Sequence, residues 1–488
     1  MPPLAVLAPP PFADFSVFDA WVAGVVLSLA LAASAHAVIY KRESRAATLW
    51  VFVIWILPAA GTLLYLLLGI NRVRRRAKAL RRKLTRHRAA SAAPAAAAEL
   101  AACGAGHLAP LVRLVDALAP RPLVAGNAIE PLLDGRAAFP AMLAAIDGAR
   151  TSVGLASYIF DGDGIGADFV SALGRACARG VAVRVLIDDV DARFSRSVAV
   201  GPLRAAGVTV GVFNPPFVPA RLNAIHLRNH RKLLVVDGTV GFTGGLNIDR
   251  RYWHPDRPDA ASRDLHFRLR GPVVSHLAEV FADDWKFTVG ESLHGPAWFP
   301  RPPPAGDLLA RGIEAGPDES IERLRWTLLG AINAAQTSIR VWTPYFVPDN
   351  ALISALSAAA LRGVEVDIYL PQHSDLPHVH WAAMGQMWQV LERGCRVWLT
   401  PGPFDHTKLL VVDGAWVLFG SVNWDARSLR LNFEFNVEVY GCELARTLDA
   451  LLHERRQPAH RLTAAHLKAR LPHVKLRDGI ARLFAPFM

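Results

Sequence analysis

Two long apolar stretches open the chain. Residues 21–40 contain no charged side chain, and residues 49–69, which read LWVFVIWILPAAGTLLYLLLG, contain none either. Each has about 20 residues, the length that a helix needs to cross the hydrocarbon core of a bilayer. Aromatic side chains lie near their ends, as they do at membrane interfaces. The pattern predicts two transmembrane helices, with a kink in the second at Pro58 and Gly61.

The flanks of these stretches bear on orientation. A secretory signal peptide is the competing interpretation, but the residues before Trp21 include Asp14 and Asp19 and no Lys or Arg. Residues 71–88 read NRVRRRAKALRRKLTRHR, a cluster that favours the cytoplasmic side and attracts anionic lipid. The connection 41–45, KRESR, is itself positive and acts against this orientation. We expect the longer cluster to prevail, which predicts a multi-pass protein of the inner (cytoplasmic) membrane with its large C-terminal part in the cytoplasm.

Beyond an Ala-rich linker at 89–110, apolar strand patterns alternate with helical patterns, and the alternation occurs twice. One copy has ARTSVGLASYIF at 149–160, and the other has AQTSIRVWTPYF at 335–346. In each copy a helix follows, then R-G-V, then a second apolar strand. This β-α-β order predicts an α/β fold in which a mixed sheet is covered by helices.

The repeat divides the chain into four parts. We expect membrane helices with a basic flank at 1–88, the linker, and two homologous domains at 111–300 and 301–488, related by a pseudo-twofold axis. The proline-rich stretch FPRPPPAG at 299–306 is the natural boundary between the two domains.

Composition narrows the kinds of ligand without choosing one. The chain has 54 Lys and Arg against 42 Asp and Glu, so its surface should attract phosphates of lipids, nucleic acids or small molecules. The four cysteines form no C-x-x-C pair, which argues against a zinc site or a disulfide framework. The stretch DGDG at 161–164 lacks the later ligands of a calcium loop and is interpreted as a turn.

Each copy of the repeat ends in the same longer motif. The first is NHRKLLVVDGTVGFTGGLNID at 229–249, and the second is DHTKLLVVDGAWVLFGSVNWD at 405–425. Alternation along a strand puts His230 and Lys232 on one face, and likewise His406 and Lys408. An ammonium and an imidazole on a common face suit an anionic phosphodiester, since the imidazole can attack phosphorus or transfer a proton. Two such clusters face to face would supply a nucleophile and an acid.

Other residues of the motifs have supporting roles. Asp237 and Asp413 belong to the catalytic motifs, but each lies at a strand end before glycine and can cap a turn. We interpret both as positioning residues. The turns at Gly245 and Ser421 lead to Asn247 and Asn423, whose amides add neutral donors for phosphate oxygens.

These motifs resemble those of the phospholipase D superfamily, and more closely those of the bacterial cardiolipin synthases. The resemblance covers nearly the whole chain and includes WILPAAGTLLYLLLG, RNHRKLLVVDGTVGFTGGLNI and GSVNWDARSLRLNFEFNVEVY. It implies a phosphohistidine intermediate formed without metal or cofactor, in which one motif histidine attacks phosphorus and the other is the acid and base. We expect His230 to be the nucleophile and His406 the acid and base, although the symmetry of the two motifs leaves the reverse assignment open. The resemblance also implies that Asp264 and Glu434 each orient a histidine. The charged segment 251–262 departs from the pattern and is expected to form a surface loop near the pocket.

Three acceptors fit the same half-sites. A second phosphatidylglycerol would give cardiolipin and glycerol, water would give phosphatidic acid, and a nucleic-acid phosphodiester would be cleaved by a nuclease. The apolar stretches hold the site beside lipid, so we expect phosphatidylglycerol and other anionic phospholipids as partners and no nucleic acid. A non-catalytic scaffold is disfavoured because neither motif has lost its His or Lys. The sequence leaves the oligomeric state open.

Overall fold

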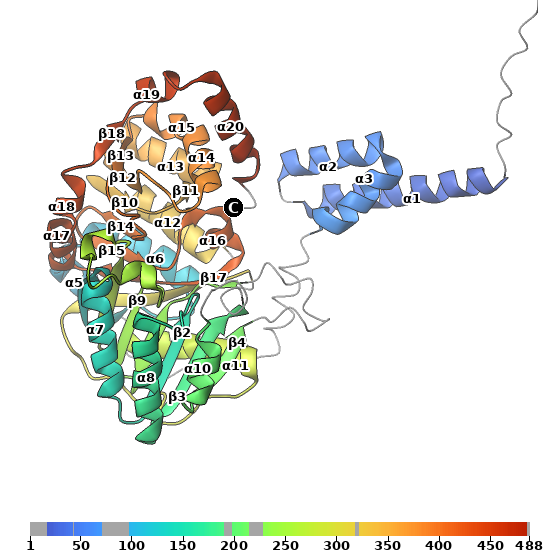
Figure 1. Cartoon of the computed structure of the whole chain (residues 1–488). Helices are drawn as coiled ribbons and strands as arrows, with labels where there is room; N and C mark the ends of the chain where they lie inside the picture. Colours follow the sequence, from blue (N-terminus) through green and yellow to red (C-terminus); the bar gives the residue numbers. More distant parts are fainter. Residues whose placement is uncertain are drawn as a thin grey trace, which may run out of the picture. The chain divides into compact units, whose positions relative to one another are not determined.

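The computed structural model describes residues 17–41, 43–70, 97–189, 198–213, 228–317 and 322–485. The chain separates into two compact units, Met1–Arg72 and Val73–Met488, and each is described by itself (Figure 1).

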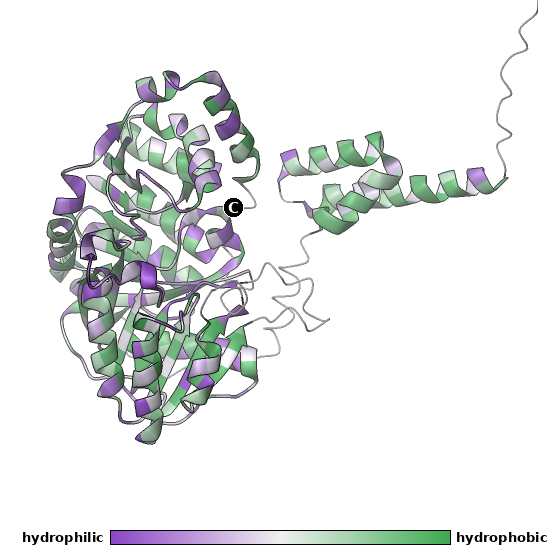
Figure 2. Ribbon diagram, in the orientation of Figure 1, coloured by the Kyte–Doolittle hydropathy of each residue, from purple (hydrophilic) through white to green (hydrophobic). Residues whose placement is uncertain are grey.

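The N-terminal unit contains four apolar helical segments, coloured by hydropathy in Figure 2. They are α1 (Val17–Tyr40), α2 (Ser44–Ile56), α3 (Pro58–Leu64) and the π-helix η1 (Tyr65–Gly69). Within the described residues, α1 is the one helix with the length and composition to cross a membrane. The N-terminal unit therefore suits membrane anchoring by one helix.

The structure does not support the prediction of a second span at 49–69, or the multi-pass arrangement, because no single described helix covers these residues. The apolar run breaks at Leu57, where φ is −130° and ψ is 76°, because Pro58 has no N–H to donate and its ring excludes a continuous helix. Gly61 then packs so closely on α2 that a Cβ there would lie 2.2 Å from the Val53 carbonyl oxygen. The basic cluster at 71–88 lies outside the described residues.

The first repeat of the large unit forms a mixed sheet with helices on it. Its elements are β1 (Val124–Leu133), α7 (Asp134–Asp147), β2 (Ser152–Ser157), α8 (Ile165–Ala178), β3 (Ala182–Asp188), α10 (Val200–Ala205), β4 (Thr209–Phe213), β5 (Arg228–Asn229), β6 (Leu233–Val236), β7 (Val240–Gly244), η4 (Arg250–Tyr252), η5 (Pro258–Ala260), β8 (Leu265–Arg270) and α11 (Val274–Val289).

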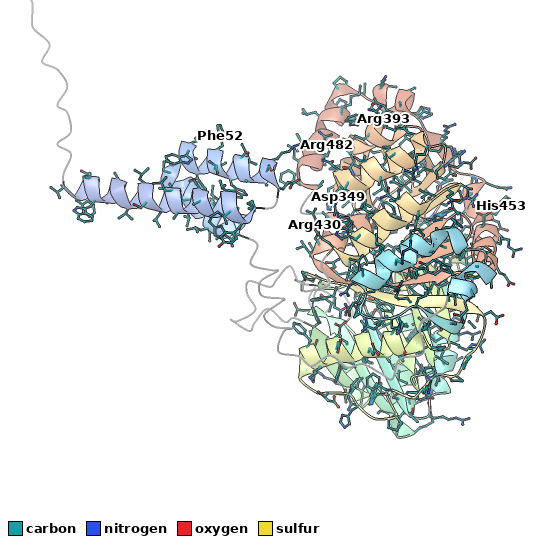
Figure 3. The ribbon with its side chains drawn as sticks, turned by 180° about the vertical axis from the view of Figure 1, so that it is seen from behind. Phe52, Asp349, Arg393, Arg430, His453 and Arg482 are labelled. Carbon is teal, nitrogen blue, oxygen red and sulfur yellow. The ribbon has the colours of Figure 1, made fainter. Side chains whose placement is uncertain are left out.

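The second repeat follows the same plan and adds elements at its C-terminal end. They are β9 (Leu308–Ala315), α12 (Arg323–Ala334), β10 (Ser338–Trp342), β11 (Phe346–Val347), α13 (Asn350–Leu361), β12 (Glu365–Pro371), α14 (Pro377–Gln386), α15 (Trp388–Leu391), β13 (Arg396–Thr400), β14 (Leu409–Val412), β15 (Trp416–Gly420), β16 (Trp424–Asp425), α16 (Ala426–Arg430), β17 (Asn432–Tyr440), α17 (Cys442–Leu451), α18 (His453–Arg456), β18 (His460–Leu462), α19 (Ala464–Lys468) and α20 (Pro472–Leu483). Asp349 caps α13 and lies 3.7 Å from Arg430 of α16 (Figure 3).

The strand order is the same in both repeats. From the centre outward it runs β1-β8-β7-β6-β2-β3-β4 in the first repeat and β9-β17-β15-β14-β10-β12-β13 in the second, with β18 added at the edge. The outer strands are parallel and the inner ones antiparallel, which confirms the predicted mixed sheet. The two repeats meet at the antiparallel pair β1–β9, as a pseudo-twofold relation requires.

A shared apolar core joins the repeats. It contains Phe267 and Leu277 of the first repeat with Phe419 and Val437 of the second, and the rings of Phe267 and Phe419 stack with centroids 3.5 Å apart. Because this core is close-packed, it fixes the position of one repeat's motif relative to the other's.

Three short helices precede β1, namely α5 (Ala97–Ala102), η2 (Gly106–Leu108) and α6 (Ala109–Leu118). Their apolar residues Leu108, Leu111 and Val115 join the core of the second repeat, together with Leu328 of α12. Spacing of three and four residues puts these side chains on one helix face, which needs an apolar partner. The domain division at residues 110 and 300 stays a prediction, and it did not anticipate this contact.

Candidate active site

Each His-x-Lys motif is hydrogen-bonded to the backbone of the opposite repeat. Strand β5 pairs in parallel with β17, and the His230 amide donates to the Phe433 carbonyl at 2.9 Å. In the equivalent contact of the other half, the His406 amide donates to the Arg263 carbonyl at 2.8 Å. The backbone therefore brings the two histidines to the seam between the repeats, where part of each half-site comes from the other half.

The two buried carboxylates are exchanged between the halves. Glu434 of the second repeat lies 3.0 Å from Nδ1 of His230, and Asp264 of the first repeat lies 2.9 Å from Nδ1 of His406. Both carboxylate residues are fully buried, and the two histidines are less than a tenth exposed. A carboxylate on Nδ1 fixes the tautomer and the ring orientation, which leaves Nε2 of each imidazole for chemistry. The sequence predicted orienting roles for both residues, but not this exchange.

The two lysines lie beside their own histidines. Lys232 Nζ donates to the His230 carbonyl at 2.8 Å, and Lys408 Nζ makes the equivalent bond to His406 as well as a 2.9 Å contact with its Nε2. Burial lowers the pKa of Lys232 to about 7 and that of Lys408 to about 8, although the nearby carboxylates oppose the shift. An entering phosphate would favour the charged form of both lysines and gain their donors.

The asparagines and small residues close the turns beneath the histidines. A Cβ at Gly245 would lie 2.3 Å from Oδ1 of Asp264, so only glycine leaves room for that carboxylate. At the equivalent position, the Ser421 hydroxyl accepts from the Phe435 amide at 3.0 Å. Asn247 accepts from the Ile159 amide at 3.3 Å through its Oδ1. Among the described atoms, Oδ1 of the buried Asn423 has no hydrogen-bond partner.

Asp237 and Asp413 lie at the far ends of β6 and β14 from the histidines. Asp237 accepts hydrogen bonds from the three consecutive amides of Arg150, Thr151 and Ser152 at 2.7–3.1 Å. Asp413 does the same for residues 336–338 and also contacts Nε2 of His107 at 2.9 Å. Both aspartates have positive φ, +49° and +52°, in the Asp-Gly turns that follow the strands. Their carboxylates fasten each motif strand to the start of its neighbour.

Comparisons with known proteins agree with this duplicated geometry. The family model described as "Cardiolipin synthase, PLD-like domain" matches residues 142–285 and 328–456. The chain belongs to this family. A second model, "Phospholipase_D-nuclease N-terminal", matches residues 28–69. Among the described residues, no group of His, Cys, Asp and Glu is arranged to hold a metal ion.

Curated relatives cover most of the chain. The major cardiolipin synthase ClsA of Bacillus subtilis (strain 168) is 33% identical over 74% of this chain and 76% of its own length. The cardiolipin synthase of Geobacillus thermodenitrificans (strain NG80-2) is 31% identical over 95% and 93%. The solved structure of a phosphatidylserine synthase from Haemophilus influenzae Rd KW20 covers 78% of this chain and all of its own, with a TM-score of 0.61 and 15% identity. This last likeness shows the fold alone.

Within this family member the two half-sites differ in their charges. Burial would raise the pKa of Glu434, but His230 and Lys232 bring it below its ordinary value. Burial raises the pKa of Asp264 to about 8 against the opposing charge of Lys408. Burial and both lysines lower the pKa of both histidines, most strongly that of His406, because Glu434 opposes the shift at His230. These directions favour the neutral form of both imidazoles and the ionised form of Glu434 beside His230.

The sequence missed two aromatic contributors to the site. The Tyr252 hydroxyl lies 3.1 Å from Nδ1 of His406, and burial raises the pKa of Tyr252 well above its ordinary value. Tyr345 lies next to the same imidazole, with ring centroids 6.3 Å apart, and donates to Asp375 at 2.6 Å. The segment 251–262 was predicted to lie near the pocket as a surface loop, but burial of its Tyr252 carried no local signal.

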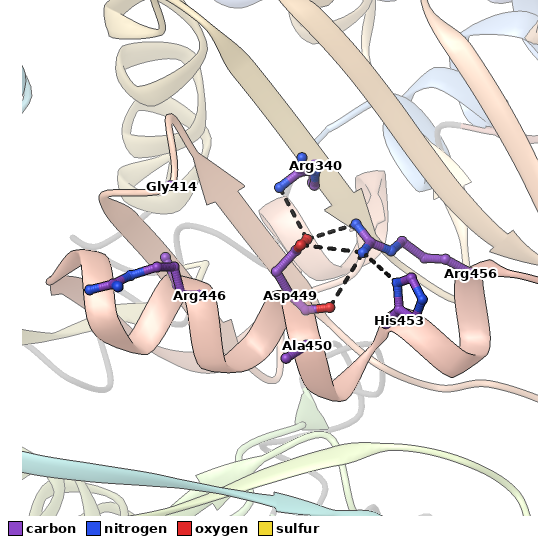
Figure 4. A pocket seen from close by; sticks show the side chains of 8 residues that line it. Arg340, Gly414, Arg446, Asp449, Ala450, His453 and Arg456 are labelled. Carbon is purple, nitrogen blue, oxygen red and sulfur yellow. Dashed lines mark hydrogen bonds and ion pairs between the residues drawn. The ribbon is translucent and has the colours of Figure 1, made fainter.

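A separate cavity of about 420 Å³ opens on the second repeat (Figure 4). At its centre Asp449 accepts from Arg340 at 3.1 Å and from Arg456 at 2.7 Å. Gly414 also lines it, next to Asp413, so the cavity lies at the end of β14 that is remote from His406. It is therefore distinct from the histidine site.

Proposed function

We propose that this chain transfers a phosphatidyl group from one phosphatidylglycerol to another, giving cardiolipin and glycerol. The proposal rests on two buried imidazoles at the seam between the repeats, each with a carboxylate from the opposite repeat on Nδ1. Such a pair suits a two-step displacement, because one imidazole can form a covalent bond while the other moves protons.

In the first step, Nε2 of His230 attacks the phosphorus of a bound phosphatidylglycerol. The bond from phosphorus to the headgroup glycerol oxygen breaks, and that oxygen takes the Nε2 proton of His406, which enters this step as an imidazolium because the negative charge of the bound phosphodiester favours its protonated form. Lys232 and Lys408 compensate the charge that develops on the non-bridging oxygens. Glu434 stabilises the positive charge that His230 gains on forming the phosphorus–nitrogen bond.

In the second step, a headgroup hydroxyl of another phosphatidylglycerol gives its proton to His406. The oxygen attacks phosphorus, the phosphorus–nitrogen bond breaks, and His230 is regenerated. We assign His230 as the nucleophile because the pKa of its partner Glu434 is lowered, whereas burial raises the pKa of Asp264, the partner of His406, to about 8. Asn247 and Asn423 would add donors to the phosphate oxygens, since both side chains are buried within the motifs.

The donor and acceptor are membrane lipids, and the apolar helix α1 suits a membrane anchor. The basic stretch 71–88 supports a cytoplasmic position for the catalytic repeats. Other anionic phospholipids are expected to compete for the same site.

The decisive experiment is transfer by the purified full-length protein in mixed micelles. With headgroup-labelled phosphatidylglycerol, labelled glycerol and cardiolipin should form together, and His230→Ala should form neither. Phosphatidic acid without cardiolipin would overturn the synthase in favour of hydrolysis. Cleavage of a nucleic acid in place of lipid turnover would contradict both lipid activities.

A further inference from the structure

Helix α20 presents its apolar face outward. Leu476, Ile480 and Leu483 are 65%, 49% and 71% exposed, whereas Asp478 on the same helix is only 2% exposed. Spacing of four and three residues puts the three apolar side chains on one face. A helix of a water-soluble surface normally has the opposite arrangement, so this face is suited to an apolar partner.

The exposed face belongs to a firmly held helix. A Cβ at Gly385 of α14 would lie 2.7 Å from the Asp478 carbonyl oxygen, so α14 and α20 are in close contact. Arg482 also donates to the Gly385 carbonyl at 3.4 Å, and this arginine is labelled in Figure 3. The buried Asp478 is neutralised by Arg470 at 2.5 Å and Arg477 at 2.9 Å. The polar side of α20 is therefore anchored, and the apolar side is left for another surface.

The surroundings extend the apolar face and make it positive. Leu471, Phe484 and Trp388 are 60%, 56% and 46% exposed, and a groove of about 280 Å³ lies among α14, α15, α19 and α20. Residues 464–485 carry five Lys or Arg and one Asp, which is the buried Asp478. An apolar ridge edged by cations complements the surface of an anionic bilayer, where acyl chains lie beneath negative headgroups.

This ridge is connected to the active site. Tyr345, whose ring lies beside His406, donates to Asp375 at 2.6 Å. Two residues after Asp375, α14 begins at Pro377, and α14 supports α20. A bilayer contact at α20 would therefore hold the rim of the second half-site beside the membrane surface.

We propose that α20, with Leu471 and Phe484, docks the catalytic repeats on an anionic phospholipid bilayer, its apolar ridge entering the boundary between headgroups and acyl chains. This contact is additional to α1 and does not require the chain to be a transferase. The occupants that the proposal rejects are the chain's own N-terminal helices and a second copy of the chain.

A fluorescent label at Ile480 tests the contact directly. The full-length protein, with its four cysteines replaced by serine and Ile480→Cys labelled by a polarity-sensitive dye, is reconstituted in nanodiscs of phosphatidylglycerol and phosphatidylcholine. The emission should shift to the blue and be quenched by lipids with a spin label on the acyl chain. Leu361→Cys on α13 is the matched control, since Leu361 is 70% exposed with no such ridge, and its label should stay in water. An aqueous label at Ile480, or a blue shift without lipid quenching, would overturn the proposal.

A second measurement links the ridge to turnover. Leu476→Glu with Leu483→Glu should lower transfer from bilayer phosphatidylglycerol by about tenfold or more, but leave transfer from dispersed short-chain phosphatidylglycerol within about twofold. Leu361→Glu should change neither rate. Unchanged bilayer activity in the double variant would contradict the docking role. If the wild type makes no cardiolipin from either substrate, the proposed function fails while the label still decides the contact.

Discussion

In the first half-site, His230 contacts Glu434, and Ser421 is the small residue of the turn. In the second, His406 contacts Asp264, and the equivalent small residue is Gly245. The shorter carboxylate is paired with the position that has no side chain, and the longer one with a serine. The backbone of the motif was thus duplicated, while the side chains around each imidazole changed in matched pairs.

The ion pairs between each motif and the helix that packs on it also have opposite signs in the two halves. In the first motif the buried Arg231 is paired with Asp284 of α11 at 2.6 Å. In the second, Asp405 of the motif is paired with Arg455 of α18 at 3.3 Å. A buried charge requires a partner, but its sign is free to exchange between the strand and the helix. The comparison teaches that the two halves keep the imidazole positions and differ in electrostatics, which is what a division of roles requires.

The largest expected effect comes from the histidines. His230→Ala and His406→Ala should each lower transfer by about 10⁴-fold to 10⁶-fold. A phosphatidyl ester of p-nitrophenol separates their roles, because its leaving group needs no acid. His406→Ala should then give a burst of p-nitrophenol and accumulate phosphatidyl groups on His230, detected by mass spectrometry.

In the same assay, His230→Ala should give no burst. A covalent adduct on His406 would reverse the assigned roles.

The carboxylates should differ from each other. Glu434→Gln should lower kcat by about 10³-fold to 10⁴-fold, since an ionised partner that fixes and stabilises the imidazole is lost. Asp264→Asn should lower kcat by a factor that is about tenfold to 100-fold smaller, because burial already favours the neutral form of Asp264, with its pKa at about 8. Steady-state kcat for both variants measures this, and equal losses would remove the proposed electrostatic difference.

The small residues sharpen the comparison further. Gly245→Ala should lower kcat by about 100-fold, because the new Cβ displaces the Asp264 carboxylate and with it His406. Ser421→Ala should lower kcat by about tenfold or less, since it removes hydrogen bonds to the Phe435 backbone and to Glu434 but displaces no group. Thermal unfolding of both variants is the control, and a Gly245→Ala protein of full activity would contradict the steric argument.

The lysines predict a pH dependence. The pKa values of Lys232 and Lys408 are lowered to about 7 and 8, so their charged forms are lost as the pH rises through this range. The affinity for inorganic vanadate, measured by calorimetry, should fall above pH 7 by up to about tenfold per pH unit. Lys232→Met and Lys408→Met should bind vanadate weakly throughout, and a flat profile in the wild type would contradict the lowered pKa values.

The motif aspartates should have the smallest effect on turnover. Asp237→Asn should change kcat by about threefold or less, but lower the free energy of unfolding by about 0.5–2 kcal/mol through weakened hydrogen bonds to the backbone amides of Arg150, Thr151 and Ser152. The pKa of Asp237 is lowered because backbone amide bonds outweigh burial, so its stabilising effect is present above the ordinary carboxylate pKa and disappears as the pH falls. Denaturant unfolding at pH 7 and pH 3 measures the loss of free energy of unfolding and its dependence on pH. A large loss of kcat in a stable Asp237→Asn protein would indicate a chemical role.

The sequence by itself determined those features that appear as local periodicity or as a repeated motif. The duplicated motif predicted that His230 and Lys232 lie together, although both precede β6 and are not on a strand, and the β-α-β order predicted the mixed sheet. The turn role of Asp237 and Asp413 was also predicted from the Asp-Gly pair.

Only the tertiary structure decided which groups meet across the fold. Glu434 is 204 residues from His230, and Asp264 is 142 residues from His406, so their exchange between halves left no local pattern. The break at Pro58 was underestimated because an apolar run of sufficient length does not by itself specify one continuous helix. The outward apolar face of α20 also depends on a tertiary contact, because the opposite side of the helix buries Asp478 against Arg470 and Arg477. A hydropathy pattern counts these three residues equally as polar, so it does not show which side of the helix faces inward.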